Sequence, residues 1–189
     1  VDFLEKVKLL SPDLFIAVGY TNILKKTLLE VPGILAANFH ASLLPAYRGK
    51  HPVFWCLRNG EQWSGLTVHA LDPGIDTGDI LYQVRIRVKM DDTVKTLYDR
   101  IMGQSVLLIE RLVVDAQNNQ LSRRPQPSAG ASYYSSITQA DYHLSWSCRA
   151  DQLRRWITMS PGECFVESEG KKIYFMDAEC VKPRAPAPP

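Results

Sequence analysis

Short apolar runs separated by polar turns dominate the first part of the chain. One continuous apolar run covers residues 14–18, and a mainly apolar stretch that reads as the next strand covers residues 34–39. Residues 22–30, between them, have the spacing of a short helix. Short runs that are apolar on both faces indicate buried parallel strands, and the strand–helix–strand order predicts a right-handed crossover. We therefore expect an α/β fold with a mostly parallel twisted sheet flanked by helices.

The middle of the chain switches between helical and extended periodicity. Residues 51–59 carry apolar side chains at helical spacing and are followed by Gly60, which is typical of a glycine-capped helix. Residues 66–71 predict a further strand. Over residues 80–90 apolar side chains alternate with polar or cationic ones, which predicts a half-buried strand with a cationic outer face.

The rest of the chain predicts a long helix, a linker and a second small domain. Asp91-Asp92-Thr93 is expected to cap one helix whose apolar stripe continues to Leu112. The predicted organisation is a main domain over 1–117, a polar linker over 118–139, the start of a small β-rich domain over 140–182, and a Pro-rich tail over 183–189.

Charge and cysteine content narrow the class of protein. The formal net charge is only +2, which gives no general attraction to nucleic acid, although a local basic patch stays possible. The four cysteines form no C-x-x-C pair, which favours free thiols in a reducing compartment. No apolar run approaches the roughly 20 residues of a membrane span. These features favour a cytoplasmic protein with no membrane partner.

Two segments carry residue types suited to chemistry. Asn38 and His40 follow a predicted strand and are two positions apart, so both point to the same side of an extended chain. Asp76 lies in a Gly-flanked acidic loop between two further predicted strands. Ligands of open α/β sheets collect at the carboxyl ends of strands, and we expect both segments at such ends. An amide, an imidazole and a carboxylate would then share one site.

These residues also have structural interpretations. An Asn after a strand commonly caps a turn, a single His is commonly structural, and Asp76 could simply bond the backbone of its own loop. His51 and His69 are expected to be structural. The four histidines lack the spacing of metal ligands, so no metal is predicted. From the residues alone, both interpretations stay open.

The order of the motifs resembles the folate-dependent formyltransferase family. The resemblance rests on Asn38-x-His40-x-Ser42-Leu43-Leu44-Pro45, on Arg48-Gly49 and on Gly74-x-Asp76-x-Gly78, and it covers about residues 10–115. Members include methionyl-tRNA, glycinamide ribonucleotide and amino-sugar formyltransferases, and formyltetrahydrofolate dehydrogenase. The resemblance implies a Rossmann-like catalytic domain. Members carry strands ahead of the one at residues 14–18, so the chain is expected to be an N-terminally truncated member.

The resemblance also implies a set of site residues. The formyl donor would be 10-formyl-tetrahydrofolate, the acceptor a primary amine, and the family's catalytic trio falls on Asn38, His40 and Asp76. Ser42 and Arg48 would contact the acceptor, although Arg48 could instead brace its loop or pair with a surface carboxylate. The folate-contact candidates are Asn22, Ile23, Leu24, Asp72, Gly74 and Ile75, and their alternative is loop and core structure.

The expected chemistry is attack of the amine on the formyl carbon through a tetrahedral oxyanion. Asn38 and a protonated His40 could donate hydrogen bonds to that oxygen, and one such donor is typically worth about 3–4 kcal/mol. Asp76 would stabilise the imidazolium and help a water carry the amine proton away.

The acceptor and the activity leave alternatives open. Lys50-His51-Pro52-Val53-Phe54-Trp55 after the Arg-Gly pair is closer to the amino-sugar members than to the tRNA enzymes, and the second domain is short. A nucleotide-linked amino sugar is therefore the expected acceptor. Methionyl-tRNA remains the first alternative. A formyltetrahydrofolate hydrolase, which releases formate, and an inactive folate-binding remnant are the others.

Overall fold

Four strands form the central sheet, in the order β1–β2–β4–β5. The computed structural model describes residues 2–20, 22 and 24–181. β1 and β2 pair in parallel, whereas β4 and β5 join antiparallel. The helix-flanked sheet expected from the sequence is confirmed, but this four-stranded sheet is mixed, since β1 and β2 are its one parallel pair. The strands are β1 (Leu14–Val18), β2 (Leu35–His40), β4 (Trp63–Ala70) and β5 (Ile80–Arg87).

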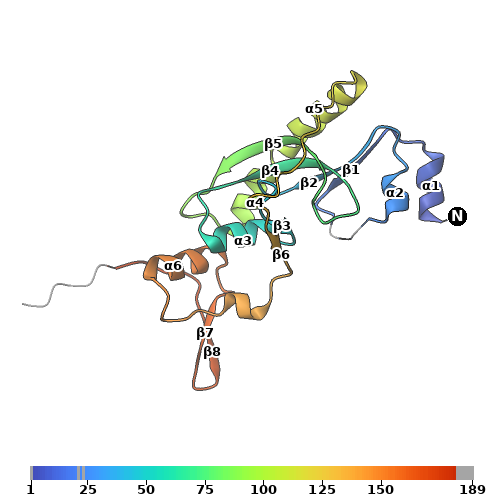
Figure 1. Cartoon of the computed structure of the whole chain (residues 1–189). Helices are drawn as coiled ribbons and strands as arrows, with labels where there is room; N and C mark the ends of the chain where they lie inside the picture. The colour runs from blue at the N-terminus through green and yellow to red at the C-terminus, as the bar shows by residue number, and fades with distance from the viewer. Residues whose placement is uncertain (1, 21, 23, 182–189) are drawn as a thin grey trace, which may run out of the picture.

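Helices and short strands surround this sheet (Figure 1). Among the described residues, no helix has the length and apolar character needed to cross a membrane. The helices are α1 (Phe3–Leu9), α2 (Lys26–Leu29), α3 (Pro52–Asn59), α4 (Val94–Met102), α5 (Ser105–Gln117) and α6 (Ala150–Met159), with a 3-10 turn at Gln139–Tyr142. The short strands are β3 (Arg48–Gly49), β6 (Tyr133–Tyr134), β7 (Phe165–Ser168) and β8 (Lys171–Tyr174).

The hydrophobic core lies on one face of β2 and β4. Because side chains alternate along a strand, Phe39 of β2 and Leu66 and Val68 of β4 share this face, where α3 and α4 contribute Phe54 and Leu97. All five side chains are almost fully buried. The opposite face of the same strands is polar and is covered by loops, and it carries the candidate site.

The single long helix predicted after residue 93 is wrong, because α4 ends at Met102 and α5 begins at Ser105. Thr93 caps α4 as expected, since its side chain accepts a hydrogen bond from the Thr96 amide at 3.1 Å. The break coincides with Gly103, a poor helix former, and with a bond from the Ser105 hydroxyl to the Met102 carbonyl. α5 therefore follows α4 as a separate helix, which contributes Leu112 to the core and lies beside β5 in Figure 1.

The segment predicted as a linker is part of the fold. Arg124 bridges to Ile80, and β6 pairs in parallel with β3. Beyond it, α6 packs against α3, and β7 and β8 form an antiparallel hairpin. The division at residues 117 and 139 stays a prediction, and the Pro-rich tail over 183–189 lies outside the described residues.

Candidate active site

Asn38 and His40 lie on the polar face of β2, on alternate positions of one strand. The register places Asn38 opposite His69 of β4 and places His40 opposite Thr67. His40 is 7% exposed and His69 1%, so both imidazoles are enclosed by protein. Strand pairing thus brings a second imidazole, that of His69, to the site next to Asn38. The sequence interpretation had treated His69 as structural.

Asp76 reaches this face from the loop between β4 and β5. Because β4 runs antiparallel to β2, its carboxyl end lies beside the start of β2, and the Leu71 amide donates to the Ala36 carbonyl at 2.8 Å. Both segments are at the carboxyl ends of strands as expected, since β2 ends at His40 and β4 ends at Ala70, but the antiparallel pairing puts these two ends at opposite edges of the sheet. The loop instead folds back over the sheet, and Asp76 adopts a left-handed φ of 54° within it.

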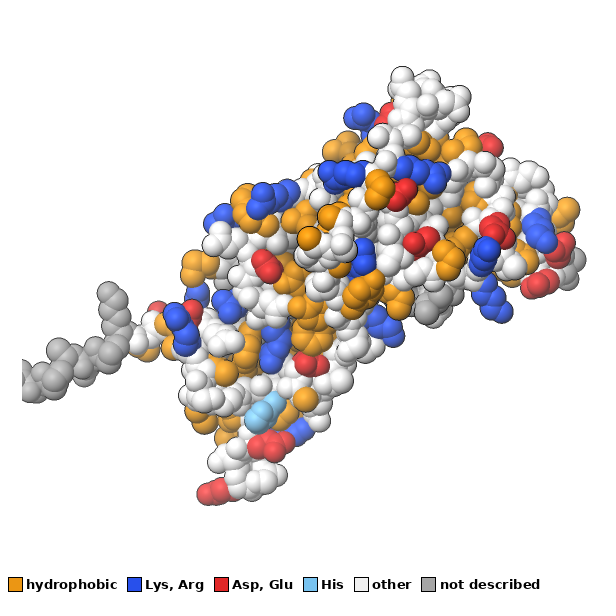
Figure 2. All heavy atoms as spheres, in the orientation of Figure 1, with side chains coloured by type: hydrophobic (Ala, Val, Ile, Leu, Met, Phe, Trp, Pro, Cys, Tyr) orange, Lys and Arg blue, Asp and Glu red, His pale blue; other side chains and the backbone are white. Residues whose placement is uncertain are grey.

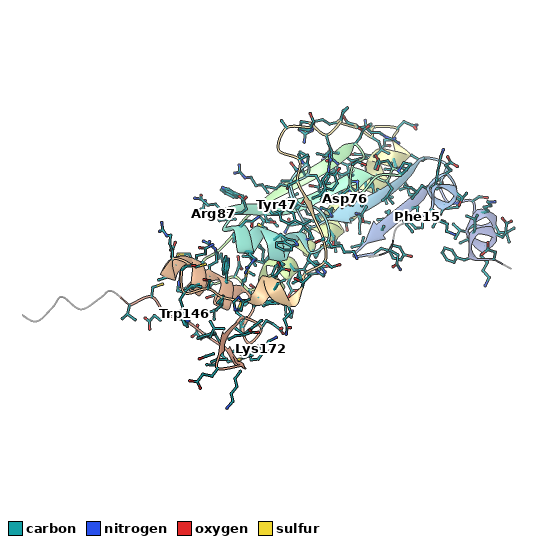
Figure 3. The ribbon with its side chains drawn as sticks, turned by 60° about the horizontal axis from the view of Figure 1, so that its bottom comes forward. Phe15, Tyr47, Asp76, Arg87, Trp146 and Lys172 are labelled. Atoms are coloured by element: carbon teal, nitrogen blue, oxygen red, sulfur yellow. The ribbon has the colours of Figure 1, made fainter. Side chains whose placement is uncertain are left out.

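The Asp76 carboxylate lies between the two imidazoles (Figure 3 labels Asp76). Its Oδ2 is 3.6 Å from His40 Nδ1, and its Oδ1 is 3.4 Å from His69 Nε2. Asn38 Nδ2 is 3.5 Å from Asp76 Oδ1 and 3.3 Å from His69 Nε2. The structure thus brings the three residues singled out in the sequence together with His69 in one cluster.

Backbone carbonyls determine the tautomers of the two imidazoles. His40 Nε2 is 2.7 Å from the Tyr47 carbonyl oxygen, and His69 Nδ1 is 2.8 Å from the Ala70 carbonyl oxygen. A carbonyl oxygen can only accept, so these two ring nitrogens carry the hydrogens. In a neutral His40 ring, Nδ1, which faces Asp76, therefore has a free lone pair. This nitrogen can take up a proton next to a carboxylate.

The electrostatic environment favours a charged Asp76 and a neutral His40. Burial by itself would raise the pKa of Asp76, but the His69 hydrogen bond, the charge of His40 and the Gly49 amide together hold it at about 2. Burial lowers the pKa of His40 below 6.5, and Asp76 and the Tyr47 carbonyl offset this only in part. The protonated His40 expected from the sequence is therefore not its resting form at neutral pH.

The structure explains why the second residue of the Arg48-Gly49 pair is a glycine. Its amide donates to Asp76 Oδ2 at 2.8 Å, and its φ is 91°. A Cβ at this position would overlap the Tyr134 carbonyl oxygen of the neighbouring strand β6. Only glycine combines this backbone angle with so close an approach, and the result is a backbone donor aimed at the carboxylate.

The predicted acceptor-binding side chains make their hydrogen bonds within the protein. The Ser42 hydroxyl donates to the Ala46 carbonyl at 2.7 Å. Arg48 is buried, and its guanidinium donates to Gln126 Oε1 and to the Tyr133 hydroxyl. This arrangement corresponds to the bracing alternative for Arg48, with an amide in place of a surface carboxylate.

The folate-contact candidates lie in two loops. Asn22 is exposed and Leu24 half-buried between β1 and α2, whereas Ile23 lies outside the described residues. Asp72 accepts hydrogen bonds from the Gly74 amide and the Thr77 hydroxyl, so it holds its own loop. Ile75, in the same loop, is 51% exposed. Their contact with folate stays a prediction.

His69 and Gln126 are the polar residues of this region that the sequence interpretation missed. The sequence placed His69 on a predicted strand, but its position opposite Asn38 depends on the register between β2 and β4, which the sequence pattern does not reveal. Gln126 falls in the segment taken for a linker. In the part of the chain that the structure describes, no three His, Cys, Asp or Glu side chains are grouped to hold a metal ion.

Comparisons with known proteins match this chain to formyl transferases. The sequence model of the formyl transferase family matches residues 1–112. The methionyl-tRNA formyltransferase of Caldanaerobacter subterraneus subsp. tengcongensis is 32% identical over 191 aligned residues, which include 100% of this chain and 62% of that protein. The chain therefore spans less than two thirds of the length of this relative.

Solved structures share the fold. Methionyl-tRNA formyltransferase from Clostridium thermocellum superposes with a TM-score of 0.74 at 20% identity, covering 94% of this chain and 77% of that one. An N-formyltransferase from Helicobacter canadensis, in complex with folinic acid and dTDP-3-aminofucose, superposes with a TM-score of 0.72 at 22% identity. The superposition covers 92% of this chain and 64% of that one. At such identities the likeness concerns the fold.

Proposed function

We propose, because this chain belongs to the formyl transferase family, that it carries the reacting centre for transfer of a formyl group from 10-formyl-tetrahydrofolate to a primary amine. The observation that carries the proposal is the cluster of Asn38, His40 and Asp76 on one polar sheet face, with separations of 3.5 and 3.6 Å. A folate in the Helicobacter relative supports the donor class.

The proposed reaction gives separate roles to Asn38, His40 and Asp76. The acceptor nitrogen attacks the formyl carbon, and the Asn38 amide donates to the oxyanion that forms. His40 Nδ1 takes the proton of the attacking amine, and the adjacent Asp76 carboxylate stabilises the imidazolium. The carbon–N10 bond of the folate then breaks, His40 returns the proton to N10, and the products are the formamide and tetrahydrofolate.

His69 is proposed to position the carboxylate in this scheme. Its Nε2 lies beside Asp76 Oδ1 and Asn38 Nδ2, and its Nδ1 is fixed by the Ala70 carbonyl. It is almost completely buried, so the substrates would meet His40 and Asp76 first. His69 therefore orients the two side chains that act on the substrate.

The pH dependence distinguishes a basic His40 from a protonated donor. We expect kcat/KM to rise with pH through an apparent pKa below 6.5, because neutral His40 accepts the proton and burial lowers its pKa. Asp76, with a pKa of about 2, stays ionised across this range. The measurement is initial rate against pH from 5 to 8. A rate that instead falls as pH rises through this region would mean that imidazolium donates to the oxyanion.

Methionyl-tRNA is the acceptor that we propose, in place of the amino sugar preferred from the sequence. The 32% identical relative that aligns with the whole chain is a methionyl-tRNA enzyme. In addition, Arg85 and Arg87 are exposed on the sheet face that carries Thr67 and His69, and their guanidinium groups lie 4.2 and 5.0 Å from the Trp63 ring centroid. Figure 2 shows Lys and Arg side chains along the upper side, where β5 lies in Figure 1. Such a strip can contact nucleic-acid phosphates.

Formylation of matched acceptors tests the proposal. With 10-formyl-tetrahydrofolate as donor, we expect formyl-methionyl-tRNA to form, and to form more slowly as salt concentration rises. A nucleotide-linked amino sugar serves as the second acceptor, and preferential formylation of it would contradict the assignment to tRNA. Formate release without any amine would identify a hydrolase. Folate binding without turnover of any acceptor would identify a binding remnant.

A further inference from the structure

Residues 118–135 cross back over the candidate site and are anchored on both sides of it. On one side, Arg124 and Ile80 exchange backbone hydrogen bonds of 2.8 and 2.9 Å. On the other side, β6 pairs with β3, which contains Arg48 and Gly49. Gln126 lies between these two anchors. Its position is therefore fixed relative to both loops of the site.

The Gln126 side-chain amide uses all of its hydrogen-bonding capacity at this point. Its Nε2 donates to the Asp76 carbonyl and to the Gly78 carbonyl, at 2.8 Å each. Its Oε1 accepts from Arg48 Nε at 3.1 Å and from Arg48 Nη2 at 2.6 Å. A single amide thus joins the acidic loop to the Arg-Gly segment.

This bridge reinforces the contact that holds the carboxylate. Gly49, the neighbour of Arg48, donates its amide to Asp76 Oδ2 at 2.8 Å. The Asp76 backbone has a left-handed φ of 54°, which an L-residue keeps only when its surroundings fix it. Gln126 holds the backbone of Asp76, and through Arg48 it holds the segment that binds the Asp76 side chain.

We infer that Gln126 is a positioning residue for the reaction, which keeps the Asp76 carboxylate between His40 and His69. The inference rests on the proposed function for its effect on catalysis. Its structural part, the location of the carboxylate, stands on the contacts alone. Neither methionine, which lacks both donors and the acceptor, nor asparagine, which is one methylene shorter, can make the whole bridge.

Gln126→Met tests this role, with Gln120→Met as the matched control in the same segment. Gln120 is exposed, and it is the backbone amide of this residue that donates to the Asp115 carbonyl. We expect Gln126→Met to lower kcat about ten- to a hundredfold through misplacement of the carboxylate, without a change in the KM for the folate donor. The acid limb of the pH profile should move to lower pH, because Asp76 raises the pKa of His40 and would do so less when it is displaced. His69 is the other side chain whose charge acts on His40. The control should behave as the unmodified chain.

An NMR titration of the His40 ring resonances provides a readout that needs no turnover. Asp76→Asn serves as the benchmark, and we expect Gln126→Met to shift the His40 titration in the same direction as Asp76→Asn does, by a smaller amount. Gln126→Asn is the second variant if the methionine variant does not fold. Absence of formyl transfer by the unmodified chain would remove the proposed function, while the titrations would still decide the position of the carboxylate. Unchanged titrations in a folded Gln126 variant overturn the inference.

Discussion

Asp76→Asn is expected to lower kcat by about 10²- to 10⁴-fold. An amide carries no charge to stabilise an imidazolium at His40. It also has only one acceptor oxygen for the Gly49 amide and the Asn38 amide, which bind opposite carboxylate oxygens at 2.8 and 3.5 Å. Steady-state kinetics with saturating folate and acceptor measure the loss. Asp99→Asn, which removes an exposed carboxylate of α4, is the charge-matched control and should keep full activity.

The same substitution has a predictable effect on stability, which has to be separated from the effect on kcat. The pKa of Asp76 is about 2 in the folded chain against an ordinary value of 3.8, so the ionised carboxylate contributes about 2 kcal/mol to the free energy of unfolding at neutral pH. This contribution is present above pH 4 and is lost as the pH falls towards 2. Denaturant unfolding of both chains should therefore show a difference that shrinks on acidification. Activity within tenfold of the unmodified chain would refute the catalytic role.

Much of the framework of the site followed from local sequence patterns. The apolar run at Leu14–Val18 gave β1 with both bounds, and the alternation after Ile80 gave β5 with its exposed arginines. Gly60, with a φ of 75°, ends α3 as expected. These signals are local, because a strand or helix that is buried on one face or on both shows a matching period of apolar residues in the sequence itself.

The contacts that complete the site could not be predicted in this way. Alternating side chains look the same in parallel and antiparallel strands, so the sequence could not tell that β4 runs against β2 or that His69 faces Asn38. Gln126 lies 50 positions from Asp76 in a segment whose composition is typical of a loop. Long-range partners of this kind depend on register and on chain crossing, which have no local signature.

Asn38→Ala is expected to reduce kcat by about 10²- to 10³-fold, a loss of roughly 3–4 kcal/mol of transition-state stabilisation. Among the described residues, the side-chain amide of Asn38 makes only long contacts in the resting site, 3.3 Å to His69 Nε2 and 3.5 Å to Asp76 Oδ1. Such weakly held hydrogens can turn to a stronger acceptor, and the oxyanion formed in the reaction is one. The KM for the folate donor should stay unchanged, because the bond forms only in the transition state.

The Asn38→Ala/Asp76→Asn double variant separates this explanation from a loss of structure. If the amide and the carboxylate act in the same step, the combined loss in kcat should be smaller than the product of the two single losses. Asn118→Ala, at the exposed end of α5, is the control for removal of an asparagine amide. A raised KM with unchanged kcat in Asn38→Ala would assign the amide to substrate binding and leave the oxyanion without its proposed donor.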